Sequence, residues 1–334
     1  MDTGKVSRAF FRQRIAPRLG ADRDDVALGP KHGVDFGVVS VGDHAVVTAT
    51  DPVSILPELG FERAGRFAVG IVLSDVAVSG LDPTHLTVSF SLPPEMTDEQ
   101  FGRVWDAIDS ECRDLGVSIV SGHTARYEGC SFPWVGAATA MAIGDPEDIV
   151  RPDGARPGDD LLVTKGPAVE VTGLFATLFG DRIDLPEDTL ETARQRLDET
   201  GTVRDARAAV GAGRVTAMHD ATEGGLLGAL HEMADSAGVR LTVDADSVPM
   251  RPGVEALSEA VSMDPWRAST AGTLLVAVDP ADTDSVLSAL EARGTPVGHV
   301  GSVKKGSGVV VDGEATDPPV GDSGWPVYER LLDE

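Results

Sequence analysis

The sequence is poor in cysteine, in lysine and in long apolar runs. Its two cysteines, Cys112 and Cys130, are too few for a disulfide framework or a cysteine zinc site. This cysteine usage is typical of a reducing compartment, so we expect a cytoplasmic protein. No apolar stretch approaches the ~20 residues that a membrane span requires, and no membrane association is expected. The basic, amphipathic stretch 5–19 predicts a surface helix and not a signal peptide.

Positive charge is also scarce. The 334 residues include 54 acidic and 28 basic side chains, of which five are lysines, and the formal net charge is -26. Such a field repels phosphates, so a nucleic-acid partner is not expected. The acidic residues are spread through the chain and form no tail. Together with the shortage of lysine, this pattern indicates a halophilic protein whose self-repulsion is screened by salt.

Hydrophobic periodicity predicts two α/β domains in tandem. In the first half we expect a hairpin of strands at 36–41 and 45–50, two helices at 62–80 and 97–115, and three further strands at 84–90, 117–120 and 135–143. Thr97 and Gln100 predict a capping box at the start of the second of these helices. The stretch 145–159 is rich in Pro, Asp and Gly and marks the boundary between the halves. In the second half we expect strands at 160–166, 215–218, 239–243, 273–278 and 297–303. Helices are expected between them, at 169–179, 187–210, 225–238 and 282–292.

The stretch 215–238 carries the strongest local signal. A short strand leads into a polar turn with His219, Asp220 and Thr222, and an amphipathic helix then starts at the pair Gly224-Gly225. Adjacent glycines cost a helix roughly 1 kcal/mol each relative to alanine, so some group is expected close to that backbone. The N–H groups of a helix start suit a phosphate, and carboxylates beside them suit a divalent cation. An ordinary helix cap at Asp220 or Thr222 explains the turn equally well.

Three other carboxylates stand in unusual places. Asp35 is expected at the start of one hairpin strand and Asp51 at the end of the other, and therefore near the same edge of the sheet. Asp75 lies in a helix that is apolar nearly all round. A buried carboxylate requires a partner, although Asp75 could also reach solvent or a serine.

Four polar turns, at 33–35, 50–52, 122–124 and 219–225, and five segments of the chain together resemble a known family. The segments are TDPV (50–53), SDVAVSG (74–80), PGDDLLVTKG (157–166), MHDATEGGL (218–226) and STAGTLLVAV (269–278). In this order they resemble the PurM-like ATP-binding superfamily of aminoimidazole ribonucleotide (AIR) synthetase, which includes thiamine-monophosphate kinase, selenophosphate synthetase and the HypE-type hydrogenase maturation factor. The resemblance covers residues 25–315 and is greatest for the HypE-type, AIR synthase-related branch.

The resemblance implies a two-domain α/β fold of the PurM-like type. The N-terminal domain would contribute strands to a β-barrel between two subunits, so that the protein would be a homodimer. The C-terminal domain would be an α/β sandwich. On this basis we divide the chain into an N-terminal helix and nucleotide loop, an ATP-binding domain, a C-terminal domain and a tail, at 1–34, 35–147, 156–315 and 316–334.

The resemblance also implies a site for ATP and Mg²⁺. The metal ligands would be Asp35, Asp51, Asp75 and Asp220. The nucleotide would be bound by Gly33, Asp35, Asp51, Gly122, Thr124, Thr222, Gly224 and Gly225. Asp220 and His123 are the candidate catalytic residues. His123 stands where thiamine-monophosphate kinases and HypE-type members usually carry Asp, while selenophosphate synthetases look more like this chain. An imidazole there could contact phosphate, act as acid and base near neutral pH, or be structural.

We therefore expect a Mg²⁺- and ATP-dependent enzyme that transfers phosphoryl to a small-molecule substrate or activates a carbamoyl or amide oxygen. The HypE likeness adds a possible maturation-protein partner. The sequence ends YERLLDE, without the cysteine that HypE-type enzymes use as carbamoyl carrier, so that exact reaction is not implied. The alternatives are a thiamine-monophosphate kinase-like phosphotransferase and a non-catalytic ATP-binding assembly factor. Lys31 and Lys165 are either phosphate contacts or solvent-facing charges.

Overall fold

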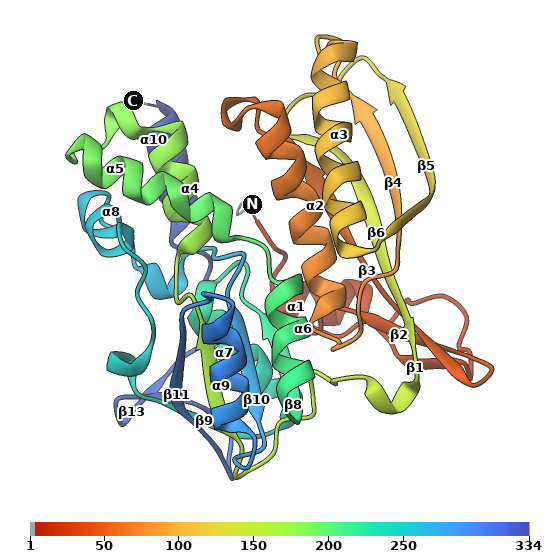
Figure 1. Cartoon of the computed structure of the whole chain (residues 1–334), viewed down its shortest axis with the longest axis vertical. Helices are drawn as coiled ribbons and strands as arrows, with labels where there is room; N and C mark the ends of the chain where they lie inside the picture. The colour runs from red at the N-terminus through yellow and green to blue at the C-terminus, as the bar shows by residue number, and fades with distance from the viewer. Residues whose placement is uncertain (1–3, 334) are drawn as a thin grey trace. The chain divides into compact units, whose positions relative to one another are not determined.

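The computed structural model describes residues 4–333 and contains two compact units (Figure 1). We call residues 25–29 and 36–149 the N-terminal unit. The C-terminal unit contains the described residues up to Asp24, the segment Pro30–Asp35, and the chain from Val150 onward. Asp35 therefore belongs to the C-terminal unit, although the strand that follows it belongs to the other.

The N-terminal unit is built on a six-stranded sheet with the order β1-β2-β3-β6-β4-β5. All neighbours pair antiparallel except β4 and β5, which are parallel. β5 is thus one edge of the sheet. The strands are β1 Val26–Leu28, β2 Gly37–Val41, β3 His44–Ser54, β4 His85–Leu92, β5 Ser118–Arg126 and β6 Trp134–Gly144.

Two long helices, α2 (Phe61–Ala77) and α3 (Asp98–Leu115), pack against each other and against this sheet (Figure 1). The predicted capping box is confirmed, because the Gln100 N–H donates to Thr97 Oγ1 at 3.2 Å and the Thr97 N–H donates to Gln100 Oε1 at 2.9 Å. The N–H groups of Thr97 and Gln100 at the start of α3 are thereby satisfied.

The C-terminal unit contains a seven-stranded sheet with the order β13-β12-β9-β11-β7-β10-β8, in which β8 is an edge strand. Its strands are β7 Asp160–Thr164, β8 Val215–Asp220, β9 Arg240–Val243, β10 Leu274–Val278, β11 Val297–Lys304, β12 Gly308–Val311 and β13 Glu314–Thr316. Its helices are α1 Arg8–Phe10, α4 Val169–Leu178, α5 Glu187–Arg194, α6 Val203–Ala212, α7 Gly225–Ala237, α8 Val254–Ala260, α9 Thr283–Ala292 and α10 Gly324–Asp333. In this unit a π-helix follows α1 at Phe11–Ile15, and 3₁₀ turns lie at Gly180–Arg182, Gln195–Glu199, Ala245–Ser247 and Pro265–Arg267. The 3₁₀ turns at Pro57–Leu59 and Pro146–Asp148 belong to the N-terminal unit.

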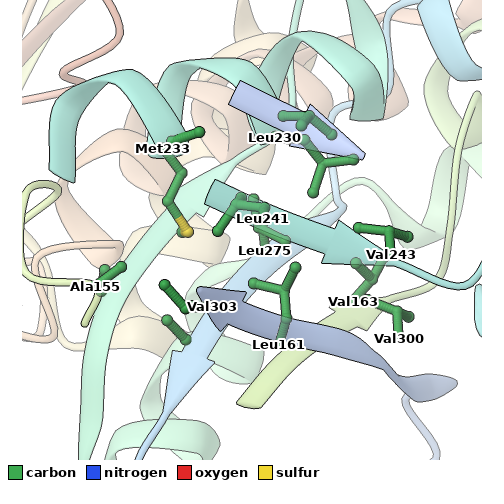
Figure 2. Close-up of a cluster of buried hydrophobic side chains, with 14 of the residues drawn as sticks. Ala155, Leu161, Val163, Leu230, Met233, Leu241, Val243, Leu275, Val300 and Val303 are labelled. Carbon is green, nitrogen blue, oxygen red and sulfur yellow. The ribbon is translucent and has the colours of Figure 1, made fainter. Parts of the chain in front are cut away.

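The main core of this unit lies between α7 and the sheet (Figure 2). Leu230 and Met233 of α7 belong to one buried cluster with strand residues that include Leu161, Leu241 and Leu275. Burial of such side chains stabilises the fold by about 1.5–3 kcal/mol each. A second apolar cluster joins α4, α5, α8 and α10. The core thus fixes α7, and with it the polar residues at the end of β8.

Some boundaries differ from the sequence prediction. β3 continues to Ser54, because the long strand β6 offers partners as far as Trp134, so Asp51 lies inside a strand and not at its end. β5 likewise continues beside β4 to Arg126 and includes the Gly122–Thr124 segment that we predicted to be a turn. The helix predicted over 5–19 is limited to α1 and the following π-helix. β1, β12, β13, α8 and α10 were not predicted. No helix among residues 4–333 combines the length and apolar character needed to cross a bilayer.

Candidate functional site

The end of β8 brings together two of the predicted metal ligands. His219 and Asp220 are the last residues of this strand, and each is only 3% exposed. Asp35 reaches the same place from the segment that precedes β2. One potential ligand atom from each of Asp35, His219 and Asp220 lies within 4.8 Å of the others. The structure therefore contains a buried acidic cluster at the position that the sequence motif indicated.

His219 lies between two carboxylates. Its Nδ1 is 2.6 Å from Asp35 Oδ2, and its Nε2 is 3.0 Å from Glu232 Oε2. Because carboxylates only accept hydrogen bonds, both ring nitrogens act as donors. Burial lowers the pKa of His219, but the charges and hydrogen bonds of Asp35 and Glu232 outweigh it and raise the pKa well above its usual value. Burial raises the pKa of Glu232, yet its hydrogen bond to His219 and the nearby positive charges bring that pKa down to about 2.

The segment 30–35 packs directly on α7. Gly33 has φ 74°, and a Cβ there would lie 2.9 Å from the Cβ of Glu232. Ser236 Oγ donates to the Gly33 carbonyl at 3.3 Å. Close packing and a left-handed backbone thus account for the glycine that we had assigned to nucleotide binding. That assignment stays a prediction.

The start of α7 is enclosed by other parts of the C-terminal unit. The Gly224 N–H donates to Asp322 Oδ2 at 2.9 Å, and Ser269 Oγ donates to the same oxygen at 2.8 Å. Neither Asp220 nor Thr222 caps the helix, because the N-cap residue is Gly224 in the left-handed region. A Cβ at Gly225 would lie 2.6 Å from the Trp266 carbonyl oxygen. The group that approaches this backbone is therefore the 3₁₀ turn Pro265–Arg267 together with the Asp322 carboxylate, and a phosphate would have to replace that carboxylate.

The remaining predicted residues lie in the N-terminal unit. Asp51 lies in β3 and Asp75 in α2, and both are partly buried. Gly122, His123 and Thr124 are exposed on the edge strand β5, beside an open hollow of 360 Å³. His123 Nε2 is 3.1 Å from the Tyr127 hydroxyl, and the two rings stack.

Lys165 is neither a phosphate contact nor a solvent-facing charge. Its Nζ is 2.8 Å from Asp205 Oδ2 and donates to the carbonyls of Glu199, Gly201 and Gly272 at 2.8, 2.8 and 3.0 Å. The lysine and aspartate side chains are only 7% and 3% exposed. These acceptors occupy the ammonium group completely, so Lys165 is structural. Lys31 is exposed, which agrees with the interpretation of this residue as a solvent-facing charge.

Three acidic residues near this site were missed. Glu232 and Asp322 have been described, and Glu170, in the first turn of α4, accepts the Ala271 N–H at 2.9 Å. Burial raises the pKa of Glu170 to about 7, with further contributions from Asp322 and Glu223. Glu232 lies between the buried residues His231 and Met233 of α7, and an acidic residue at such a place in the apolar pattern was a signal that could have revealed it.

The residues at the end of β8 fit a hard divalent cation. Mg²⁺ is typically held by one or two carboxylates together with water and phosphate oxygens. Asp35 and Asp220 supply two carboxylates within the cluster. Both nitrogens of His219 already face carboxylates, so the ring is not an additional ligand in this arrangement.

Comparison with known proteins identifies the family. The family described as AIR synthase related protein matches twice, its N-terminal domain at residues 33–143 and its C-terminal domain at 156–314. The chain therefore belongs to the AIR synthase-related family. It is 29% identical to the carbamoyl dehydratase HypE of Rhizobium leguminosarum bv. viciae, over 80% of this chain and 77% of that protein. It is 27% identical to a selenide, water dikinase of Citrifermentans bemidjiense, over 92% and 94% of the two chains.

Solved structures share the fold. The hydrogenase maturation protein HypE in complex with ATP has a TM-score of 0.65 at 22% identity, covering 95% of each chain. AaThiL complexed with AMPPCP and TMP has a TM-score of 0.70 at 21% identity, covering 86% of this chain and 90% of that one. The HypE–HypF complex contains a chain with a TM-score of 0.68 at 18% identity, covering 84% and 93%. The expected PurM-like superfamily and its two-domain α/β fold are confirmed, and the relatives include the HypE-type proteins that the motifs indicated.

Proposed function

We propose that the protein is a Mg²⁺-dependent, ATP-utilising enzyme that phosphorylates or phosphoryl-activates an oxygen of a small molecule, in the manner of a HypE-like maturation factor. The observation that carries the proposal is the buried pairing of Asp35 and Asp220 at the end of β8. Carboxylates that converge in a largely buried place repel each other, and a cation between them relieves that repulsion. The choice of ATP is supported by solved proteins with this fold, of which a HypE is in complex with ATP and AaThiL with AMPPCP.

Within this proposal, Asp35, Asp51, Asp75 and Asp220 hold magnesium. The bound ion would neutralise the negative charge of the phosphates, which is the main requirement of phosphoryl transfer. Asp35 and Asp220 orient it from the C-terminal unit, and His219 keeps Asp35 in place. The main-chain N–H groups near Gly224 become available to an anionic group only if the Asp322 carboxylate moves away, and His123 remains a candidate acid, base or phosphate contact.

The acceptor differs among the relatives. HypE proteins are named carbamoyl dehydratases, and one solved HypE is bound to HypF, so a carbamoyl or amide oxygen and a maturation-protein partner are proposed first. AaThiL was solved with TMP, and a phosphotransferase of that kind is the second candidate. Both candidates use the same metal ligands and differ only in the acceptor.

The test is ATP binding, measured by calorimetry in high salt with and without Mg²⁺. We expect magnesium-dependent binding by the wild type, and we expect Asp51→Asn to weaken it by about tenfold or more, because a charged ligand of the cation is lost. Asp43→Asn is the matched control, since Asp43 is an exposed residue in the turn between β2 and β3 of the same unit. A wild type that binds no ATP in either condition overturns the proposal, and equal affinities of the two variants overturn the role of Asp51.

We also propose a homodimer in which β5 takes part in an intersubunit barrel. β5 is an edge strand whose residues are mostly exposed, including Val120 at 54%, and Trp134 of β6 is 57% exposed. An exposed edge of this length is a template for pairing with another chain. Light scattering should give twice the 34.8 kDa of one chain, and Val120→Lys should shift the mass toward one chain. A wild type with the mass of a single chain contradicts this.

A further inference from the structure

The Asp35 carboxylate has a specific support in the C-terminal unit. Its Oδ2 contacts His219 Nδ1 at 2.6 Å, and this histidine is the direct neighbour of Asp220 in β8. The opposite side of the ring is held by Glu232 at 3.0 Å. Glu232 comes from α7, whose apolar face is buried in the main core. A continuous chain of hydrogen bonds therefore connects a rigid helix to the proposed metal ligand.

We propose that His219 is a positioning residue that fixes the Asp35 carboxylate beside Asp220 and that is itself fixed by Glu232. The positioning role depends on the proposed function for one point only, namely that Asp35 binds magnesium. The arrangement resolves a geometric problem, because Asp35 lies on an irregular segment whereas Asp220 lies on a strand. By tying Asp35 to the residue next to Asp220, the histidine sets the relative position of the two carboxylates before any ion is bound.

The electrostatics favour the same role. Two carboxylates whose oxygens lie within 4.8 Å of each other repel strongly in a buried place. The ring of His219 lies between the carboxylates of Asp35 and Glu232 and next to Asp220 in the chain, with one ring nitrogen facing each of the two carboxylates. Without it, repulsion would push Asp35 and the segment 30–35 away from β8. A neutral side chain with a single donor group cannot replace it, because it satisfies only one of the two carboxylates.

His219 acts through Asp35 and not as a ligand or a base. It is only 3% exposed, and each ring nitrogen faces a carboxylate oxygen within hydrogen-bond distance. Mutation of a residue that holds a metal ligand in place by a hydrogen bond typically lowers metal affinity by roughly 10–100-fold. The same size of effect is expected for this histidine.

The first readout is hydrogen exchange of the backbone amides at 31–36 in the metal-free protein, with His219→Gln, Glu232→Gln and Glu232→Met. His219→Gln and Glu232→Met should accelerate exchange in this segment, whereas Glu232→Gln should leave it near wild type because its amide oxygen still accepts from Nε2. His231→Gln is the matched control. His231 is also a buried histidine, at 6% exposure, but its Nε2 contacts Thr316 Oγ1 at 3.0 Å. Unchanged exchange in His219→Gln overturns the proposal.

The second readout is the magnesium-dependent part of ATP binding by the same variants. We expect His219→Gln and Glu232→Met to weaken it by roughly tenfold, and Glu232→Gln and His231→Gln to bind like the wild type. Loss of binding in His231→Gln as well would show a general structural effect and would overturn a specific role. If the wild type itself shows no magnesium-dependent binding, the proposed function fails, while the exchange measurement still decides whether His219 holds Asp35.

Discussion

Lys165→Met should lower the free energy of unfolding by about 3–5 kcal/mol, because it removes one partner of a buried ion pair. The ammonium group of Lys165 is 2.8 Å from Asp205 and bonds three backbone carbonyls. Burial raises the pKa of Asp205, but the charge of Lys165 and hydrogen bonds from Lys165, Thr295 and Arg293 outweigh it and lower the pKa below its usual value. Methionine leaves this carboxylate without its main counter-ion and the carbonyls without a donor.

Urea unfolding in high salt measures the loss. Lys304→Met is the control, since Lys304 is an exposed lysine at the end of β11, and its effect should stay within about 0.5 kcal/mol. The double variant Lys165→Met/Asp205→Asn should recover part of the stability, because the uncompensated carboxylate is also removed. A loss in Lys165→Met no larger than that in Lys304→Met would show that the ion pair contributes little.

Lys165 also illustrates what the sequence could not reveal. The strand before it was predicted correctly from its apolar run, and a lysine at its end suggested solvent or phosphate. Its partners are the Asp205 side chain and the carbonyls of Glu199, Gly201 and Gly272, which lie between 34 and 107 residues away. Side-chain partners at that separation depend on how elements pack, and periodicity carries no information about them.

The candidate site was likewise predicted only in part from the sequence. The motif around Asp220 and the resemblance that it carries selected Asp35 and Asp220, which the structure brings together. His219 was predicted to lie in a polar turn. It lies instead at the end of a strand, and its hydrogen-bond partners Asp35 and Glu232 are 184 and 13 residues away in the sequence. The paired glycines were correctly taken to mean a close approach, but local sequence could not show that the approaching backbone belongs to Pro265–Arg267.

Glu170→Gln should make the protein more stable at pH 8 by up to about 3 kcal/mol and leave it nearly unchanged at pH 4. The pKa of Glu170 is raised from 4.5 to about 7 by burial, and by the charges of Asp322 and Glu223, against the effect of the Ala271 N–H. Between these values the native state keeps a proton that the unfolded state has lost. Stability therefore falls as pH rises through this window, by roughly 1.4 kcal/mol per unit of pKa difference.

Above pH 7 the carboxylate is charged in both states and the penalty stays constant, whereas below pH 4.5 it is neutral in both states and the penalty disappears. Glutamine is neutral throughout and still accepts from Ala271, so the difference between wild type and variant isolates this one group from the other acidic residues. Urea unfolding at several pH values between 4 and 8, at one fixed high salt concentration, measures that difference. Glu255→Gln, an exposed acid in the first turn of α8, should give a nearly parallel curve. If Glu170→Gln is also parallel to the wild type, the carboxyl of Glu170 titrates normally and is solvated in the folded protein.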